Sequence, residues 1–185
     1  MHLMIPLITQ TPRLTILSAS RALLTAELHK PHYFHVLLGA EMPADWPPST
    51  YERATQENAL ERLTEGGRDA AGWYGWYALR KADDIAPRTL IGAGGFLGPP
   101  DAAGTVEIGY SIAADWRGQG LGTELVAGLV QQAADTGMVR LLIAYAPADN
   151  PAGQQVLLRN GFAQTEATDS AGRPRFERPV EPAAK

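Results

Sequence analysis

The chain has 185 residues, of which 45% are hydrophobic and 19% are charged, the proportions of a soluble globular protein with a buried core. Its 20 acidic and 16 basic residues give a formal net charge of −4, which argues against a nucleic-acid-binding protein that relies on a basic face. The absence of cysteine excludes disulfides, thiolate metal sites and a cysteine nucleophile.

The apolar runs are short, and none approaches the roughly 18 residues of a membrane-spanning helix. Residues 1–8 are apolar but lack a basic start, so we expect no signal peptide. No internal repeat or long low-complexity linker divides the chain. The sequence therefore predicts one domain over residues 1–185, with its core at about 11–180, in a cytoplasmic protein with neither a membrane nor a nucleic-acid partner.

The first third of the chain combines one strand pattern with several helix signals. Pro31 should separate two helices, and Ser49-Thr50-Tyr51-Glu52 has the spacing of a capping box. Residues 41–48 are too rich in proline for regular structure. The expected order is a strand at 11–17, a helix from a Ser18 or Ser20 cap to Leu28, a short helix ending at Gly39, a loop at 41–48 and a helix at 49–65.

Three strand patterns follow one another, at 73–79, 90–97 and 105–112, and the turn residues between them predict an antiparallel meander. After a glycine-rich turn, an apolar residue at every fourth position from Leu121 to Ala133 predicts a helix that ends at Gly137. The expected order continues with a buried strand at 140–146, a helix from Asn150 to Arg159, a hairpin of strands at 162–168 and 173–180, and a frayed tail at 181–185.

The glycine-rich turn is the strongest signal for function. It consists of Arg117, Gly118, Gln119, Gly120, Leu121, Gly122 and Thr123. Glycine lets the backbone approach a ligand closely, and the first amides of a helix point outward at the positive end of its dipole. The turn therefore predicts an anion site, most naturally for a phosphate or a pyrophosphate.

Two common nucleotide motifs do not fit this turn. A P-loop ends in Gly-Lys-Ser/Thr, and no such triplet occurs in the chain. A dinucleotide fold needs G-x-G-x-x-G and an acidic residue after the next strand, but Thr123 stands at the third glycine position and the next strand ends in Tyr145-Ala146. Both classes are therefore disfavoured.

Residues 117–122 resemble the Q/R-x-x-G-x-G/A loop that binds the pyrophosphate of acyl-coenzyme A in GNAT N-acetyltransferases. The resemblance extends to residues 106–110 and 150–162, covers about 11–180, and its Thr-Pro-Arg-Leu opening is most similar to the branch that acetylates ribosomal proteins. It implies an α/β (α+β) GNAT fold. Such a fold has a mixed sheet of about six to seven strands, with an antiparallel meander and a splayed parallel pair, flanked by about four helices.

The resemblance also implies where acetyl-coenzyme A binds, namely between the strand that ends near Ile112 and the strand at 140–146. Gly109 would mark a bulge after which these strands separate. Asn150 would lie near the cofactor arm, although it is equally well explained as the N-cap of the following helix. The implied cofactor-binding residues are Tyr110, Ser111 and Ile112 for pantetheine, residues 117–123 for pyrophosphate, and Asn150.

Acetyl transfer to an amine requires a base, because the amine must be neutral when it attacks. Glu107 lies in mid-strand beside the expected cleft and is the candidate base, directly or through a water; the alternative is a solvent-facing carboxylate. Family members often have a tyrosine acid seven residues after the asparagine, but this chain has Leu157 there. Ser111, Tyr145 and an unassisted thiolate are the alternatives for the acid step.

The acceptor side has weaker signals. The candidate substrate-binding residues are Glu41, Trp46 and Trp76. Core packing is the alternative for the two tryptophans. His29, His32 and His35 invite a metal site, but a proline interrupts them and no acidic motif accompanies them, so we predict no metal.

These observations predict an enzyme that moves an acetyl group from acetyl-coenzyme A to a primary amine by direct attack in a ternary complex. The acceptor is a protein N-terminus, a peptide or a small-molecule amine. A non-catalytic acyl-coenzyme A-binding module is the alternative, and a nucleotide-binding protein is a weaker third. We expect a monomer or a homodimer.

Overall fold

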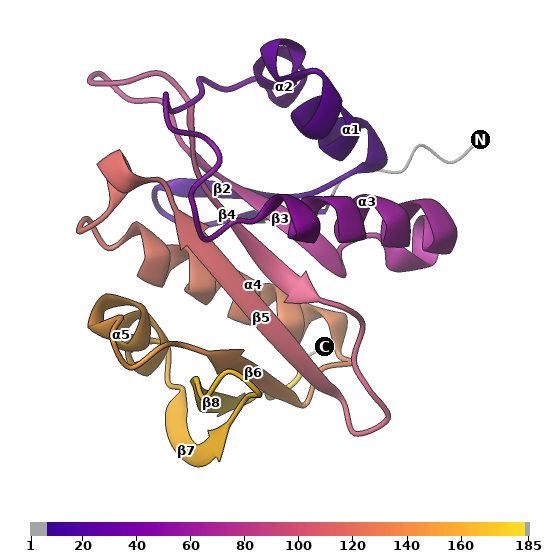
Figure 1. Ribbon diagram of the computed structural model, residues 1–185, viewed down its shortest axis with the longest axis vertical. Coiled ribbons are helices and arrows are strands. Elements are labelled where there is room, and N and C mark those ends of the chain that lie inside the picture. The colour runs from indigo at the N-terminus through magenta and orange to yellow at the C-terminus, as the bar shows by residue number, and fades with distance from the viewer. Residues whose placement is uncertain (1–6, 184–185) are drawn as a thin grey trace.

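The computed structural model describes residues 7–183. Within this range eight strands form one mixed sheet in the order β1-β2-β3-β4-β5-β6-β8-β7, accompanied by five α-helices. The expected α/β class is confirmed, with more strands than the six or seven predicted. Figure 1 shows α1 and α2 beside the N-terminal strands, and α5 beside β6 at the opposite end of the sheet.

The strands are β1 (Ile8–Gln10), β2 (Leu14–Ser18), β3 (Tyr74–Arg80), β4 (Thr89–Leu97), β5 (Thr105–Ile112), β6 (Leu141–Tyr145), β7 (Ala163–Thr168) and β8 (Pro174–Pro179). The helices are α1 (Arg21–His29), α2 (Pro31–Leu38), α3 (Arg53–Gly66), α4 (Leu121–Thr136) and α5 (Pro151–Arg159), with 3₁₀ turns η1 (Gly67–Ala70) and η2 (Ala114–Trp116). None of the helices in residues 7–183 is both long and apolar enough to cross a membrane.

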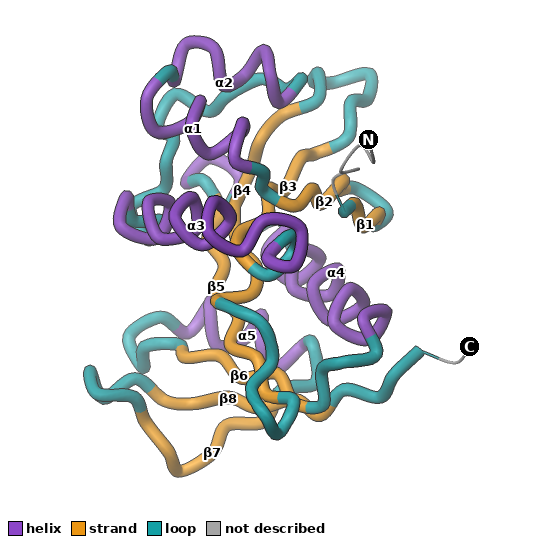
Figure 2. The backbone as a smooth tube through the Cα atoms, turned by 90° about the vertical axis from the view of Figure 1, so that its right-hand side faces the viewer, coloured by secondary structure: helices purple, strands orange, loops and turns teal. Residues whose placement is uncertain are grey.

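Apolar side chains cover both faces of the sheet, as β3 illustrates. Trp76 and Ala78 join the cluster packed against α4, whereas Tyr77 and Leu79 join the cluster under α1, α2 and α3. Figure 2 shows α3 and α4 on opposite sides of the strands. Since side chains alternate between the faces of a strand, one continuous apolar run serves both cores.

Helix boundaries agree with most of the predicted signals. Ser20 caps α1 through a hydrogen bond from Leu23 N at 3.2 Å. Pro31 stands in the first turn of α2, and Gly39 ends that helix in the left-handed conformation with φ 68°. Gly137 ends α4 in the same way with φ 67°. These caps explain why single residues mark the ends of the helices so clearly in the sequence.

The start of the chain differs from the prediction. The strand expected at 11–17 begins only at Leu14, because Thr11-Pro12-Arg13 turns the chain back onto β1, with Thr11 N donating to Leu14 O at 2.9 Å. Strand β1 is one strand more than the prediction contained. The expected lack of a signal peptide concerns residues 1–8, of which residues 1–6 lie outside the described residues, as do residues 184–185 of the tail.

The capping box predicted at Ser49–Glu52 is not formed. Helix α3 begins at Arg53, and its N-cap, Glu52, makes no side-chain capping hydrogen bond. Residues before it form a turn in which Tyr51 N donates to Pro48 O at 2.9 Å. The hydroxyl of Thr50, in the same turn, is hydrogen-bonded to Ser111 on β5.

Candidate active site

Strands β5 and β6 run parallel but pair over only a short stretch. Residues 105–107 lie opposite 141–143, after which the strands separate while β5 continues to Ile112. The expected bulge at Gly109 is absent, because the β4–β5 register continues unbroken from Ile108 to Ile112. The separation arises on β6, whose last residues stay paired with β8. The splayed parallel pair is present, but for a different reason than predicted.

The end of β5 presents backbone groups to this gap. Ala113 N donates to Ile91 O on β4 at 2.9 Å. Because the direction of the amide and carbonyl groups alternates along a strand, those of Ile112 and Tyr110 face the gap and those of Ser111 face β4. Two of the three residues expected to pair with an extended ligand therefore have backbone groups at the gap, and Ser111 does not.

The glycine-rich turn lies where β5 leads through η2 into α4. Gly118 and Gly120 have φ of 73° and 79°, a region in which other residues are strained. Gly120 is the N-cap of α4 and no side chain caps the helix, so its first amides have no partner within the helix. Arg117 Nε donates to Ile112 O at 2.9 Å and joins the turn to the end of β5. The turn thus offers unpaired donors beside a cation.

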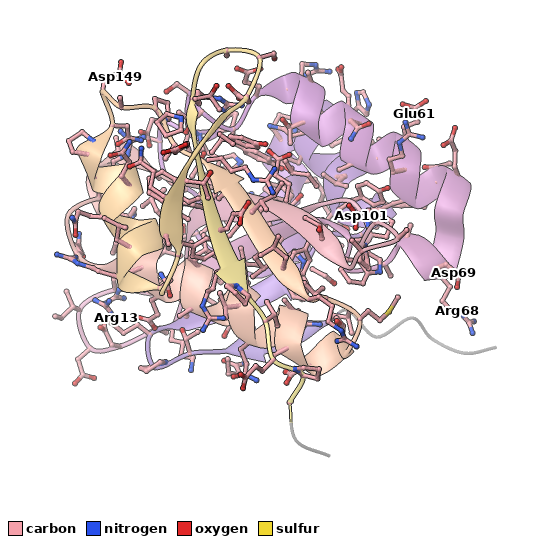
Figure 3. The ribbon with its side chains drawn as sticks, turned by 90° about the horizontal axis from the view of Figure 1, so that it is seen from below. Arg13, Glu61, Arg68, Asp69, Asp101 and Asp149 are labelled. Atoms are coloured by element: carbon pink, nitrogen blue, oxygen red, sulfur yellow. The ribbon has the colours of Figure 1, made fainter. Side chains whose placement is uncertain are left out.

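Arg13, directly before β2, reaches the same turn. Its Nε is 2.7 Å from Glu124 Oε2 on α4, and its Nη1 donates to Gln119 O at 2.9 Å. Burial alone would raise the pKa of Glu124, but hydrogen bonds from Thr11 and Arg13 together lower it and keep the carboxylate ionised. Figure 3 shows Arg13 on the same flank as Asp149 in the loop before α5. Arg13 and Glu124 therefore form an ion pair that joins the segment before β2 to the start of α4 beside the turn.

A cavity of about 800 Å³ opens between α3, the middle of the sheet and the ends of β6 and α5. Its wall combines residues from Thr50 to Ala59, the glycine-rich centre of β4 and residues 107–111 of β5. Tyr145, Asn150 and Arg173 line its other end. The cavity thus lies against the sheet at the point where β5 and β6 separate.

Glu107 lies half-buried in the wall of this cavity. Burial raises the pKa of its carboxyl above the ordinary value, the nearby charges of Arg173 and Arg175 oppose the increase, and Asp169 adds to it. No hydrogen bond contributes to this shift. A carboxylate with a raised pKa and no donor holding it is suited to accept a proton from a ligand in the cavity.

The start of α5 contacts β5 across the gap. Tyr110 Oη donates to Gly153 O at 2.7 Å, and burial raises the pKa of this phenol. Asn150 Oδ1 accepts from Gly153 N at 3.0 Å, so Asn150 is the N-cap of α5. Both residues also line the cavity. One of the two explanations for Asn150, the structural one, is therefore confirmed.

The alternatives for the acid step are placed differently from one another. Leu157 is fully buried in the core under α4. The Ser111 hydroxyl is buried and hydrogen-bonded to Thr50 at 2.6 Å. Tyr145 lines the cavity, with the Arg173 guanidinium 5.9 Å from its ring centre. Of the two side chains, Tyr145 is the one whose hydroxyl has no such partner among residues 7–183.

Three residues predicted for the acceptor side do not line the cavity. Trp76 is 1% exposed, packs edge-on against Phe96 and donates its Nε1 to Gly72 O at 2.9 Å, so it belongs to the core. Trp46 donates to a buried carboxylate at 3.0 Å. Glu41 is exposed and forms a backbone bridge to Thr89. The assignment of these residues to the acceptor side is corrected accordingly.

The three histidines do not converge. His29 lies in the last turn of α1 and His32 and His35 lie on α2, all exposed. Among residues 7–183 no group of three or more histidine, aspartate or glutamate side chains is arranged to hold a metal ion.

A buried carboxylate that sequence reasoning missed lies behind the cavity wall. Glu27 on α1 accepts hydrogen bonds from Trp46 Nε1 at 3.0 Å, Tyr51 Oη at 3.3 Å and Tyr77 Oη at 2.5 Å. Burial raises the pKa of Glu27, and these hydrogen bonds oppose the increase. Since Tyr51 also lines the cavity, Glu27 ties α1, β3 and the loop before α3 to the cavity wall.

Other residues missed from the sequence are Arg13, Thr50 and Arg173. Arg13 belongs to the Thr-Pro-Arg-Leu opening, a signal that marked similarity but no role. Thr50 had a local interpretation as part of a capping box, and Arg173 follows an ordinary turn sequence. Each meets its partner through the tertiary fold, with sequence separations of 61 between Thr50 and Ser111 and of 106 between Arg13 and Gln119.

A parallel pair that separates beside an uncapped helix start, with a carboxylate in the adjoining cavity, is suited to hold an extended anionic ligand next to a proton acceptor. The model of the acetyltransferase (GNAT) domain matches residues 21–163, and the chain belongs to this family. The resemblance found in the glycine-rich turn is confirmed.

Individual relatives agree with this assignment. The chain is 27% identical over 153 residues to the uncharacterized N-acetyltransferase YjdG of Bacillus subtilis (strain 168), covering 83% of this chain and 88% of that protein. It is 38% identical over 58 residues to the ribosomal-protein-serine acetyltransferase of Escherichia coli (strain K12), covering 31% and 32% of the two chains.

A solved structure shows the same fold. RimL, described as a ribosomal L7/L12 alpha-N-protein acetyltransferase in complex with coenzyme A, matches with a TM-score of 0.61 and 16% identity, covering 95% of this chain and 99% of that one. The expected similarity to ribosomal-protein acetyltransferases is therefore found in both sequence and structure.

Proposed function

We propose that this protein is an acetyl-coenzyme A-dependent N-acetyltransferase that transfers the acetyl group directly to a primary amine in a ternary complex. One observation carries the proposal. The gap between β5 and β6 is bordered by an uncapped helix start at one end and by Glu107 in a cavity at the other. These features match the two ends of the reaction, an anionic thioester donor and an amine that must lose a proton.

The donor would lie along the gap. Backbone groups of Tyr110 and Ile112 pair with the pantetheine arm, as an added strand would. The amides of residues 118–123 and the charge of Arg117 hold the pyrophosphate. Asn150 keeps its cap and offers its side-chain amide to the arm. RimL, with the same fold, was solved in complex with coenzyme A, which supports this donor.

The acceptor would enter through the cavity beneath α3. Its ammonium group gives a proton to Glu107, directly or through a water, and the neutral amine attacks the thioester carbonyl carbon. A carbon–nitrogen bond forms and the carbon–sulfur bond breaks. The attacking nitrogen loses its second proton, and this loss balances the one proton that the leaving coenzyme A thiolate takes up. Tyr145 lines the cavity and its hydroxyl has no hydrogen-bond partner among residues 7–183, so we assign it to pass that proton to the thiolate; otherwise the thiolate leaves unassisted.

The acceptor we favour is a protein or peptide α-amine. The match to the ribosomal-protein-serine acetyltransferase and the fold of RimL support this preference. We also propose that the chain works as one domain, because a single sheet joins elements from both ends of the described range.

A direct test measures thiol release from acetyl-coenzyme A with pooled amines and N-terminal peptides, and identifies acetylated products by mass. The enzyme hypothesis expects release that depends on both donor and acceptor. The alternative, a non-catalytic acyl-coenzyme A-binding module, is favoured by Leu157 at the usual tyrosine position. It expects thermal stabilisation by coenzyme A without release from any amine. Stabilisation by ATP or NAD but not by coenzyme A would contradict both.

A further inference from the structure

The charges that line the cavity are few and of opposite sign. Among the described residues they are the carboxylates of Glu52 and Glu107 and the guanidinium of Arg173. Arg173 comes from the turn between β7 and β8, far in sequence from Glu107, and its side chain is 47% exposed. The cavity thus has a carboxylate in its wall and a cation at its rim.

Arg173 is held in position from two sides. Its Nε donates to Asp169 Oδ2 at 2.6 Å, and Asp169 is itself held by the amides of Ala171 and Arg173 at 3.0 Å and 2.8 Å. The guanidinium lies 5.9 Å from the ring centre of Tyr145. Only Nε is used in this arrangement, and no residue from 7 to 183 is hydrogen-bonded to the two terminal nitrogens. An arginine fixed this way is prepared to bind a carboxylate through both.

We propose that the acceptor is a primary amine with a carboxylate close to the amine, and that Arg173 binds this carboxylate while Glu107 receives the proton of the amine. The inference rests on the proposed function and narrows its acceptor. An acceptor that has only an amine would interact with Glu107, and the Arg173 guanidinium would remain solvated. An acceptor with a carboxylate next to the amine would interact with both residues in one cavity. The source is a free amino acid or the acidic first residue of a peptide.

A competing role for Arg173 is to keep Glu107 ionised, because its charge lowers the pKa of that carboxyl. The two roles predict different measurements. Loss of a counter-charge shifts the pH dependence for every acceptor equally. Loss of a carboxylate-binding group removes the preference for acidic over amidated acceptors at every pH.

The experiment compares kcat/KM for matched acceptor pairs. One pair is an α-amino acid and its carboxamide, and the other is a peptide beginning with aspartate and the same peptide beginning with asparagine. We expect the acid of at least one pair to be preferred by about two- to fivefold, as suits a half-exposed arginine–carboxylate contact that solvent screens. R173Q should abolish the preference, and R173K should retain part of it because charge remains without the planar fork.

Arg175→Gln is the matched control. Arg175 lies on the same hairpin and its charge also lowers the pKa of Glu107, but it does not line the cavity. R175Q should shift the pH profile and keep the acid preference. Preference in only one pair supports the proposal and identifies the source as amino acid or peptide.

Equal rates for acid and amide in the unaltered protein would overturn the proposal while leaving the acetyltransferase function intact. The proposal would also fail if R173Q slowed both members of each pair equally. Absence of acetylation with every amine would reject the proposed function as well. Thermal unfolding of R173Q and R175Q separates these outcomes from loss of folding.

Discussion

Glu107 shows at the level of one residue how position determines chemistry. The sequence placed it on the strand face opposite Val106 and Ile108, and those two residues are buried under α4 while Glu107 lines the cavity. Its pKa is raised by burial and modulated by three charged groups of the β7–β8 hairpin. A glutamate in the same strand on the other face would be an unpaired charge in the core.

Replacement of Glu107 by glutamine should lower kcat by about a hundredfold, the lower range for loss of a general base. The dissociation constant for acetyl-coenzyme A should stay unchanged, since the donor is held by backbone groups elsewhere. Glu52→Gln, a second and exposed cavity carboxylate, is the control and should retain activity. Wild-type kcat in the Glu107 variant would exclude it as the base.

The same residue predicts a pH dependence. The base is active when ionised, and burial raises its pKa above the ordinary value of 4.5. The value of kcat/KM should therefore fall as pH decreases through an apparent pKa above that of an exposed glutamate, and E107Q should lose this acidic limb.

At the scale of elements, the turn between η2 and α4 depends on contacts from three parts of the chain. Arg13 approaches it from the segment before β2, Arg117 joins it to β5, and Gly122 lies 3.4 Å, measured from an added Cβ, from Val156 on α5. Position 120 favours glycine because its φ is 79° and because Arg13 leaves little room for a side chain there. The conformation of the turn therefore depends on its contacts with the segment before β2, the end of β5 and α5.

Gly120→Glu should weaken coenzyme A binding at least a hundredfold, equal to about 2.7 kcal/mol, by putting bulk and negative charge at the helix start. Gly137→Glu is a closely matched control, because Gly137 caps the other end of α4 with φ 67° and open space around it. Both variants bear similar backbone strain, of about 1–2 kcal/mol. Calorimetric titration should show coenzyme A binding lost only in the Gly120 variant, and equal affinities would contradict the assigned pyrophosphate site.

At the scale of the whole molecule, Glu27 joins the helical layer to the sheet. Its carboxylate receives donors from the loop before α3 and from β3, while α1 packs on both α2 and α3. Three neutral donors are hydrogen-bonded to the buried carboxylate of Glu27. Without this carboxylate each of these donors would be left without a partner, which is why the network stabilises the fold. The same hydrogen bonds hold Tyr51 in the cavity wall, so they contribute both to the stability of the fold and to the shape of the proposed acceptor site.

Glu27→Gln should lower the free energy of unfolding by about 1–3 kcal/mol, because one amide cannot accept from all three donors. The folded-state pKa of Glu27 is raised above the ordinary 4.5, so its titration contributes stability below that value that is lost as pH rises through the folded pKa. Glutamine does not titrate. The difference between the two proteins should therefore be largest in acid and narrow toward neutral pH.

Denaturant unfolding from about pH 4 to about pH 8 measures this difference. Glu61→Gln, an exposed carboxylate on the surface of α3 in Figure 3, is the control and should follow the parent protein at each pH. A difference for Glu27→Gln that grows toward neutral pH would contradict a raised pKa for Glu27 in the folded protein.

Local signals were sufficient for most elements. Ser20, Pro31, Gly39 and Gly137 act through their own backbone neighbours, and each ends or begins a helix where the sequence indicated. Local patterns failed at Ser49–Glu52, where the chain forms a turn with Pro48 and the helix begins only at Arg53. They also failed at Gly109, where the strands separate because β6 stays paired with β8. A short-range sequence pattern does not show how contacts with distant parts of the chain alter the local structure.

The amino-acid sequence by itself determined the fold class, the glycine-rich turn and the carboxylate face of β5, because periodicity and backbone conformation depend on near neighbours. Only the tertiary structure decided which side chains share the cavity. In the folded protein Trp46 and Trp76 lie outside the cavity, whereas Arg173 and Tyr145 line it together with Glu107. The physical reason is that a cavity is assembled from the ends of several elements, and their approach is set by packing over the whole sheet.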